Sequence, residues 1–412
     1  MKNKHLFTLF ICLLLAVINA ESQSVSQWRG TNRDGNYSEQ NLLKIWPEVG
    51  PELLWLNETI GDGYGSPVIS GDKLFINGEI NKVSYLFAFG LDGKLIWKSA
   101  NGSEFAGSEY SANFPGARST PTVDHDLVYV ASGMGRIACF DAASGAEKWT
   151  VDMVADLGGK PGYFGYSESL LTDEKLLYCF PGGTETNLAA LDKLSGKVVW
   201  TSKALGDGVS YCSPLMINLP ERNILVNISH DYLMGLDARN GELLWSFKED
   251  SVKLEGTYCN TPVYQDGFIY GVSGVDQGTG AYKLQLSDDG KSISEIWRNA
   301  DTKNAFGGFV VVNNKLYCAA KDNKLKALDL NTGLESESVG GMKGSVIAAE
   351  NKLICYADNG KVNLIDLSGP KMEVVSKFKI ENGTKEHFSH PVIADGVLYV
   401  RHGNALMAYK IR

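Results

Sequence analysis

Polar and aromatic residues recur along the sequence just before, or at the start of, a series of short apolar runs. They include tyrosines, one arginine, one carboxylate and two histidines, which would form a ligand site if the fold brought them together. The histidines could act as acid and base or as ligands, or simply hydrogen-bond within a wall. The alternative for the whole group is a set of polar side chains that only face water. The residues are Tyr64, Ser66, Arg118, Ser119, Tyr166, Glu168, Tyr211, Cys212, Tyr258, Asn260, Phe306, Lys343, His387 and His390.

A repeated turn indicates which elements hold these residues. Glycine lies four residues before tryptophan in "LDGKLIW", "FDAASGAEKW", "LDKLSGKVVW" and "LDARNGELLW". Glycine adopts the positive φ of a tight connection without strain, and the aspartates of the last three copies can accept hydrogen bonds from the amides of their own turn. We therefore expect hairpins, and we expect the tryptophans to pack between neighbouring units because aromatic rings bury the most apolar area. The glycines are Gly93, Gly145, Gly196 and Gly241, and the aspartates are Asp141, Asp192 and Asp237.

Two further strand-like runs precede each turn, and eight such pairs can be counted along the chain. Tryptophans 97, 149, 200, 245 and 297 recur at roughly the 40 to 50-residue spacing of four-stranded propeller blades. No segment keeps a helical period, so helices should be few. The sequence therefore predicts an all-β, eight-bladed propeller of antiparallel blades. Because the first strand of each blade lines the central channel, the candidate site residues should meet at one mouth of that channel.

The last unit, "EHFSHPVIADGVLYVRHGNALMAYKIR", contains only three strands. The lone segment from Pro51 to Asn57 precedes the first complete unit, and its Trp55 matches the tryptophan position of a fourth strand. We expect this N-terminal strand to complete the last blade, because closure removes an exposed sheet edge. The predicted organisation is a leader over residues 1–20, an arm over residues 21–50 and one propeller over residues 51–412.

The first twenty residues have the pattern of a secretory signal peptide. Lys2 and Lys4 precede an apolar run from Leu6 to Ile18, and Ala20 is a suitable last residue before cleavage. The alternative is an uncleaved anchor, but the run is shorter than the roughly 20 apolar residues that span a bilayer. Cys12 has no small residues before it and is a poor lipidation site. We expect a periplasmic or secreted, monomeric protein with no transmembrane segment in the mature chain.

The charge balance argues against a nucleic-acid partner. The chain has 39 basic and 48 acidic side chains, a net charge of −9. Loss of the leader removes two lysines and no acid, which makes the net charge −11. Proteins that follow a nucleic-acid backbone carry the opposite sign.

Six cysteines remain beyond the leader, and none forms a CxxC pair that would indicate a zinc or redox site. Four lie in apolar runs and are expected to be buried thiols. Cys212 and Cys259 occupy equivalent places in consecutive units, so a disulfide is conceivable in an oxidising compartment. We favour two free thiols, because such positions are expected to lie further apart than the roughly 5.5 Å between Cα atoms that a disulfide prefers.

The turns and paired runs resemble the PQQ-type β-propeller repeat, the family of quinoprotein alcohol dehydrogenases and of the BamB-type outer-membrane assembly factor. The arm "QWRGTNRDGNYSEQNLLKIWPEVGPELLW" and the segments "GYSESLLTDEKLLYCFPGG" and "HPVIADGVLYVRHG" are similar to exported bacterial members. In the dehydrogenases the quinone lies over calcium in the channel, and this resemblance implies Glu168 and Asn260 as candidate calcium ligands. The sequence departs from the dehydrogenases at "NAFGGF", which has no aspartate to abstract the alcohol proton, and it has no adjacent cysteine pair.

Two functions follow from the resemblance. The first is an exported binding or scaffold module that holds a protein or carbohydrate ligand at the channel mouth, with its partner in the cell envelope. The alternative is a periplasmic dehydrogenase that uses PQQ and calcium to oxidise alcohol or sugar hydroxyls. The missing aspartate and the missing cysteine pair favour the binding module. The resemblance to the dehydrogenases does not weigh against this choice, because one fold can carry unrelated functions.

Overall fold

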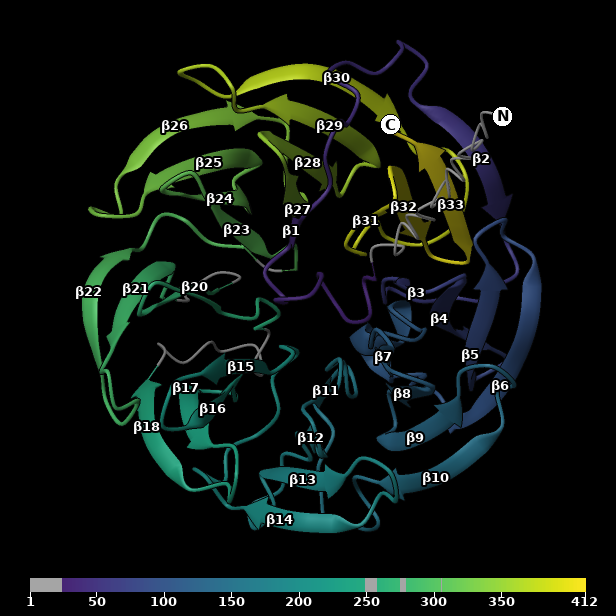
Figure 1. Cartoon of the computed structure of the whole chain (residues 1–412), viewed down its shortest axis with the longest axis vertical. Coiled ribbons are helices and arrows are strands. Elements are labelled where there is room, and N and C mark those ends of the chain that lie inside the picture. Colours follow the sequence, from purple (N-terminus) through teal and green to yellow (C-terminus); the bar gives the residue numbers. More distant parts are fainter. Residues whose placement is uncertain (1–23, 249–257, 275–278, 305) are drawn as a thin grey trace, which may run out of the picture.

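The computed structural model describes residues 24–248, 258–274, 279–304 and 306–412. These residues form eight four-stranded antiparallel blades around a central axis, with one short 3₁₀ helix, η1 (Glu109–Asn113) (Figure 1). The predicted all-β class and the predicted number of blades are confirmed. The predicted signal peptide lies outside the described residues, so it stays a prediction. Among the described residues, no helix is long and apolar enough to cross a membrane.

The first four blades follow one another in chain order, and each runs from the channel to the rim. Blade 1 comprises β3 (Val68–Ser70), β4 (Lys73–Ile80), β5 (Val83–Gly90) and β6 (Leu95–Ser103). Blade 2 comprises β7 (Thr122–Asp124), β8 (Leu127–Ala131), β9 (Arg136–Asp141) and β10 (Glu147–Asp152). Blade 3 comprises β11 (Leu171–Thr172), β12 (Leu176–Cys179), β13 (Leu188–Asp192) and β14 (Val198–Ser202). Blade 4 comprises β15 (Leu215–Asn218), β16 (Asn223–Ile228), β17 (Tyr232–Asp237) and β18 (Leu243–Lys248).

The other four blades complete the ring. Blade 5 comprises β19 (Val263–Gln265), β20 (Phe268–Val272), β21 (Ala281–Leu286) and β22 (Ile293–Asn299). Blade 6 comprises β23 (Phe309–Val312), β24 (Lys315–Ala320), β25 (Lys324–Asp329) and β26 (Glu335–Gly340). Blade 7 comprises β27 (Gly344–Ala349), β28 (Lys352–Ala357), β29 (Lys361–Asp366) and β30 (Glu373–Lys379). Blade 8 comprises β31 (Val392–Ala394), β32 (Val397–His402), β33 (Ala405–Lys410) and the N-terminal β2 (Glu52–Asn57).

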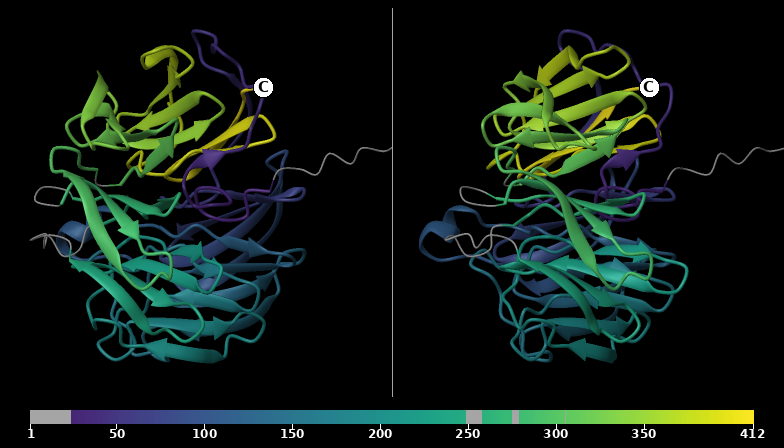
Figure 2. Two further views of the ribbon diagram at one scale, coloured as in Figure 1. Left: turned by 60° about the vertical axis from the view of Figure 1, so that its left-hand side comes forward. Right: turned by 90° about the vertical axis from the view of Figure 1, so that its left-hand side faces the viewer.

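The N-terminal strand closes the ring as predicted. β2 pairs antiparallel with β33, with Trp55 opposite Ala408, and Figure 2 shows the purple strand beside the yellow ones. Arg401 of β32 reinforces this closure from inside the core. Its guanidinium donates to the carbonyls of Gly65 at 3.1 Å and Asn77 at 2.7 Å in or next to blade 1. Backbone pairing therefore holds the N-terminal strand in the last blade, and side-chain hydrogen bonds from Arg401 join the last blade to the first.

Five of the repeated tryptophans lock their blade to the next one, as predicted for residues that pack between neighbouring blades. The indole N–H of Trp149 donates to the Lys193 carbonyl in the following turn at 3.1 Å. A Cβ on Gly196 of that turn would lie 2.6 Å from the indole ring, so glycine is needed there for space as well as for its positive φ. Trp245 is an exception, because its indole N–H has no hydrogen-bond partner among the described residues. The same lock is made by Trp55, Trp97, Trp200 and Trp297.

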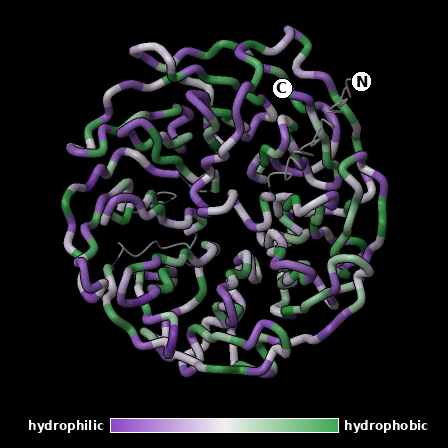
Figure 3. The backbone as a smooth tube through the Cα atoms, viewed as in Figure 1, coloured by the Kyte–Doolittle hydropathy of each residue, from purple (hydrophilic) through white to green (hydrophobic). Residues whose placement is uncertain are grey.

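The apolar core lies between the faces of neighbouring blades. The middle strands are buried almost throughout, as in β16 and β28, because each is covered on both faces. Apolar stretches accordingly recur all round the ring in Figure 3. Four cysteines of the middle strands are buried free thiols, as predicted: Cys139, Cys179, Cys318 and Cys355.

The arm crosses the central channel, a placement that the sequence analysis did not predict. Its short strand β1 (Asn36–Tyr37) pairs in parallel with β27, and Figure 1 shows the purple segment near the axis. Arg33, which is 2% exposed, donates to the carbonyls of Ser169 and Pro214, both at 2.9 Å. Arg29 donates to the Phe309 carbonyl at 2.6 Å. The arm therefore ties blades on opposite sides of the channel and closes part of its length.

Candidate functional site

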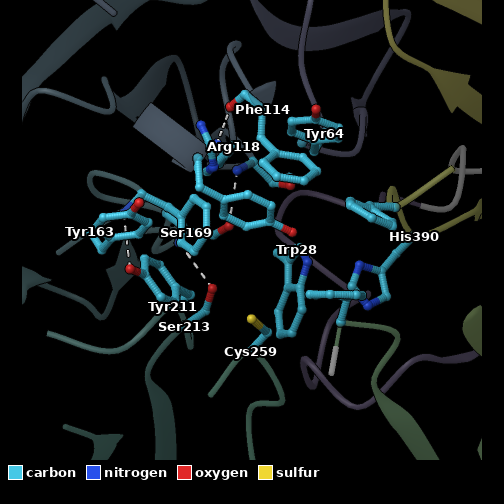
Figure 4. A pocket seen from close by; sticks show the side chains of 17 residues that line it. Trp28, Tyr64, Phe114, Arg118, Tyr163, Ser169, Tyr211, Ser213, Cys259 and His390 are labelled. Carbon is cyan, nitrogen blue, oxygen red and sulfur yellow. Dashed lines mark hydrogen bonds between the residues drawn. The ribbon is translucent and has the colours of Figure 1, made fainter. Parts of the chain in front are cut away.

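A cavity of about 700 Å³ lies at one mouth of the channel (Figure 4). The arm contributes Trp28, and the remaining lining comes from the connections that lead into the first strands of the blades. That volume is within the range of small-molecule sites. Its lining residues are Trp28, Tyr64, Gly65, Tyr110, Phe114, Arg118, Thr120, Tyr163, Phe164, Ser167, Ser169, Tyr211, Ser213, Cys259, Phe306, Phe388 and His390.

Aromatic rings form two walls of this cavity. On one side Phe164 makes edge-to-face contacts with Phe114 and Tyr163, at ring-centroid distances of 6.0 and 5.0 Å. On the other side Phe306 stacks on Phe388 at 4.6 Å. Edge-to-face and offset contacts of this kind hold rings in fixed orientations. The mouth is therefore an apolar slot with rigid sides.

Arg118 is the only charged side chain among the described residues that line the cavity, because burial holds the pKa of His390 well below its usual value. The guanidinium of Arg118 donates to the Gly116 carbonyl at 2.9 Å and to the Phe114 carbonyl. It also lies over the Tyr64 ring, 5.5 Å from the ring centroid. These contacts fix a cation in an otherwise neutral, aromatic site.

A belt of hydroxyl groups links blades 2 to 5 beside the channel. The Thr120 amide donates to Ser169 Oγ, the Ser169 amide to Ser213 Oγ and the Ser213 amide to Thr261 Oγ1, at 2.9 to 3.0 Å. Each bond joins one blade to the next, so the recurrent Ser or Thr just before the first strand is structural. Ser169 and Ser213 of this belt also line the cavity.

Two buried polar atoms of the lining lack a hydrogen-bond partner within the described protein. They are Nε2 of His390 and the hydroxyl of Ser167. The His390 side chain is 8% exposed, and its ring meets Trp28 edge to face at 5.3 Å. Buried polar groups are normally paired, so these two atoms suit a ligand that offers hydrogen bonds.

The structure brings together some of the predicted site residues. Tyr64, Arg118, Tyr211 and His390 line the cavity, together with Phe306. The other predicted residues are not among those that line it.

Tyr166 and Tyr258 lie in the wall rather than in the cavity. They are 3% and 2% exposed, and the Tyr166 hydroxyl donates to the Pro181 carbonyl at 2.9 Å. The expectation that these two tyrosines meet at the mouth is therefore not supported by their positions.

Lys343 and His387 lie beside a much smaller hollow of about 10 Å³. Lys343 forms an ion pair with Asp358 at 3.1 Å. His387 stacks on His402 with ring centroids 3.7 Å apart, and its Nδ1 lies 2.5 Å from the Tyr356 hydroxyl. Burial, with the neighbouring His402 as a second cause, lowers the pKa of His387 to about 4. The two residues have local structural partners.

Cys212 and Cys259 are both free thiols, as favoured from the sequence. Cys212 is buried, and its Sγ contacts the Tyr258 carbonyl at 3.2 Å. Cys259 instead faces the cavity. Burial raises the pKa of the Cys259 thiol to about 12, so it is protonated at neutral pH and is not an activated nucleophile.

Comparison with known proteins shows the family. A family model described as "Outer membrane protein assembly factor BamB" matches residues 52–159 and 82–336, which is more than half of the chain. The chain belongs to the BamB family.

Curated relatives and solved structures agree with this assignment at low identity. The chain is 22% identical over 309 residues to the outer membrane protein assembly factor BamB of Shewanella oneidensis, covering 63% of this chain and 69% of the relative. Two other BamB relatives are matched over 60% and 48% of their lengths, less than two thirds. BamB from Moraxella catarrhalis superposes with a TM-score of 0.61 at 12% identity, covering 84% of this chain and 94% of that one. A europium-containing methanol dehydrogenase gives 0.66 at 10% identity, covering 92% and 90%. At these identities the superpositions show the fold alone.

Glu168 and Asn260 of this BamB-family chain do not fit a calcium site for a quinone. The Asn260 amide is engaged by the wall, because Nδ2 donates to the carbonyls of Val272 and Asn304 and Oδ1 accepts from the Gly308 amide. Calcium takes six to eight oxygen ligands, and neither candidate is among the residues that line the cavity.

Glu168 is itself enclosed within the propeller. One carboxylate oxygen accepts from the Phe180 amide at 2.7 Å, and the other is buried without a partner in the described chain. Burial raises its pKa to about 7, an effect that the Phe180 amide and the positive charge of Arg33 oppose. Within the described ranges, the only three metal-ligating His, Cys, Asp or Glu side chains that could meet on one ion are Asp207, His230 and Asp231, outside the cavity.

Sequence reasoning missed the loop and arm residues that make most of this BamB-family mouth. Tyr110 and Phe114 come from the loop between β6 and β7, and Tyr163 and Phe164 from the loop between β10 and β11. These two connections are much longer than the three residues that join β26 to β27. Aromatic residues in long loops at one end of a propeller are a usable signal, because binding residues concentrate on loops held by a rigid scaffold.

Proposed function

We propose that this propeller is a non-catalytic binding module of the cell envelope that holds a protein or carbohydrate ligand at its aromatic mouth. The observation that carries the proposal is the lining of the mouth. Its described residues offer rigid rings, hydroxyls and the single cation Arg118, but no carboxylate. Such a lining provides area and orientation for a ligand.

The same lining argues against the dehydrogenase alternative. Oxidation of a hydroxyl needs a base within reach of the proton that it abstracts. The described lining contains no carboxylate, His390 has a lowered pKa because of burial, and Glu168 is not among the lining residues. Arg33 and Trp28 also place the arm across the channel where it borders the mouth.

The relatives support an envelope location and a protein partner. They are named outer membrane protein assembly factors, and the first twenty residues of this chain have the pattern of a secretory leader. We propose a periplasmic or otherwise exported protein that acts as a monomer and works beside other envelope proteins.

A cofactor reconstitution separates binding from catalysis. The purified protein is incubated with PQQ and Ca²⁺, and dye-linked oxidation of a panel of alcohols and sugars is followed by absorbance. We expect no turnover above the rate without protein. Turnover that depends on both additives and is lost in Glu168→Gln would contradict the proposed function and support the dehydrogenase alternative.

A further inference from the structure

The cation at the mouth has no anionic partner among the described residues. Arg118 forms no ion pair within 4.0 Å with any described residue, and Glu104, whose negative charge acts on it, is engaged in other hydrogen bonds. Glu104 Oε1 accepts from the amides of Phe105 and Gly133, at 2.9 and 2.6 Å. Arg118 therefore keeps N–H groups that can bind an incoming anion.

The position of Arg118 is fixed before any ligand arrives. Its guanidinium lies over the ring of Tyr64 and over that of Phe105, 5.5 and 5.4 Å from their centroids. Its hydrogen bond to the Gly116 carbonyl helps to fix the orientation of the guanidinium plane. A planar guanidinium matches a carboxylate through two parallel hydrogen bonds. Because the fork is held in place by these contacts, little side-chain entropy is lost when an anion binds.

The neutral polar atoms of the mouth are suited to a ligand that carries separate hydroxyl groups. His390 Nε2 and the Ser167 hydroxyl are buried without partners in the described chain, and both belong to the lining. A polypeptide would instead bring a row of backbone N–H and C=O groups. The amides of the hydroxyl belt are already bonded from blade to blade, so an inserted peptide would leave buried backbone groups unpaired at a cost.

The aromatic walls favour a ligand that also presents apolar surface between its polar groups. Phe164 with Tyr163 stands on one side, and Phe306 with Phe388 on the other. The C–H faces of a pyranose ring present flat apolar area of this kind while its hydroxyls project from the edge. A phosphate group would be a poorer match, because its larger charge would meet one cation only.

We propose that the mouth binds a carboxylated sugar, a hexuronic acid residue of an acidic oligosaccharide, with its carboxylate on Arg118 and its hydroxyls on His390 and Ser167. The proposal rests on the proposed function and names the ligand class for the same site. The ring of the sugar lies between the aromatic walls.

The test uses two ligands of equal size. Binding of trigalacturonic acid and of its methyl ester to the mature protein is measured by isothermal titration calorimetry. The ester keeps the rings and hydroxyls but removes the negative charges. We expect the acid to bind about tenfold or more tightly than the ester, because hydrogen bonds to a charged partner are the stronger ones.

Variants locate the effect. Arg118→Gln should bind the acid and the ester equally weakly, and Arg118→Lys should recover part of the preference. The matched control is Arg298→Gln, because Arg298 also lies over a ring, 5.3 Å from the Phe247 centroid, but belongs to β22 away from the mouth. It should bind the acid like the unsubstituted protein.

Several results would overturn the proposal. They are no binding of the acid by the unsubstituted protein, equal affinity for acid and ester, an undiminished preference in a folded Arg118→Gln, or tighter binding of a triglutamate peptide than of the sugar acid. The ligand comparison on the unsubstituted protein decides the matter even if Arg118→Gln does not fold. In any of these cases the binding module would stand, because it is tested separately by the cofactor reconstitution and by crosslinking at the mouth.

Discussion

Trp28 of the arm meets His390 of the last blade edge to face, with ring centroids 5.3 Å apart and planes inclined by 83°. The two residues are separated by almost the whole propeller in sequence, yet they share one border of the mouth. The arm is thus part of the site as well as a strap across the channel. A change in the arm should therefore alter ligand binding.

Two arm tryptophans test this relationship against each other. Trp28 and Trp46 are 8% and 4% exposed, and truncation of a buried tryptophan to alanine costs about 3 kcal/mol or more. We expect Trp28→Ala and Trp46→Ala both to lower the melting temperature. Only Trp28→Ala should weaken ligand binding at the mouth, because Trp46 packs on Phe378 instead. Equal losses of binding would show that the arm acts only through stability.

Closure of the ring should depend on Arg401. It is fully buried, and its guanidinium donates to four backbone carbonyls, including Gly61 at 3.1 Å and Asn77 at 2.7 Å. Loss of charged donors leaves those carbonyls unpaired, so Arg401→Met should destabilise the protein by about 3 kcal/mol or more.

Hydrogen exchange provides the measurement for closure. In Arg401→Met, amides of β2 and β33 should exchange faster while those of β16 remain protected. Lys203→Met is the control, since that side chain is 64% exposed and pairs with Glu185, which is 80% exposed. Unchanged protection of β2 would mean that backbone pairing alone closes the ring.

The buried carboxyl of Glu168 should make stability depend on pH. Burial raises its pKa from the usual 4.5 to about 7, so the folded state favours the protonated form. The protonated carboxyl contributes fully to the free energy of unfolding below pH 4.5, and this contribution is lost as the pH rises toward 7. The loss is at most about 1.4 kcal/mol per unit of pH.

Glu168→Gln, which cannot titrate, should remove this slope. We expect the melting temperature of the unsubstituted protein to fall relative to that of the variant between pH 4.5 and 7.5. Glu185→Gln is the control, because its side chain is 80% exposed. Parallel curves for the unsubstituted protein and Glu168→Gln would rule out a buried carboxyl with a raised pKa.

Two glycines with similar backbone conformations test how much the packing of a tryptophan on the next blade contributes to stability. Gly196 and Gly158 have similar φ values of 71° and 65°, but a Cβ would lie 2.6 Å from Trp149 at Gly196 and meet nothing within 4 Å at Gly158. Gly158→Ala should cost about 1 kcal/mol for its backbone conformation alone. Gly196→Ala should cost clearly more in urea unfolding, and equal costs would mean that the indole moves aside freely.

The blades and their closure could be predicted because their signals are local and repeated. Glycine, aspartate and tryptophan at fixed spacing specify a turn, and Trp55 marks the strand that the last blade needs. The arm has no such signal, since Arg29 reaches a carbonyl 280 residues away in sequence and no repeat unit contains an equivalent.

The site residues were harder to predict because alternate side chains face opposite sides. Ser167 and Ser169 line the cavity, whereas Tyr166 and Glu168 between and beside them face the wall. In the same way Cys259 faces the cavity and its neighbours Tyr258 and Asn260 do not. A shift of one residue moves every side chain to the other face, and the sequence does not show the register.

The central claim is that the mouth holds a ligand in the cell, and site-specific photo-crosslinking tests it most directly. The photoreactive amino acid p-benzoylphenylalanine is placed at Tyr163 in the mouth or at Leu91 in the turn between β5 and β6, which are 37% and 36% exposed. After irradiation of cells, denaturing electrophoresis should show a discrete adduct for the Tyr163 position and none for Leu91. Adducts at neither position, or equally at both, would contradict a ligand site at the mouth.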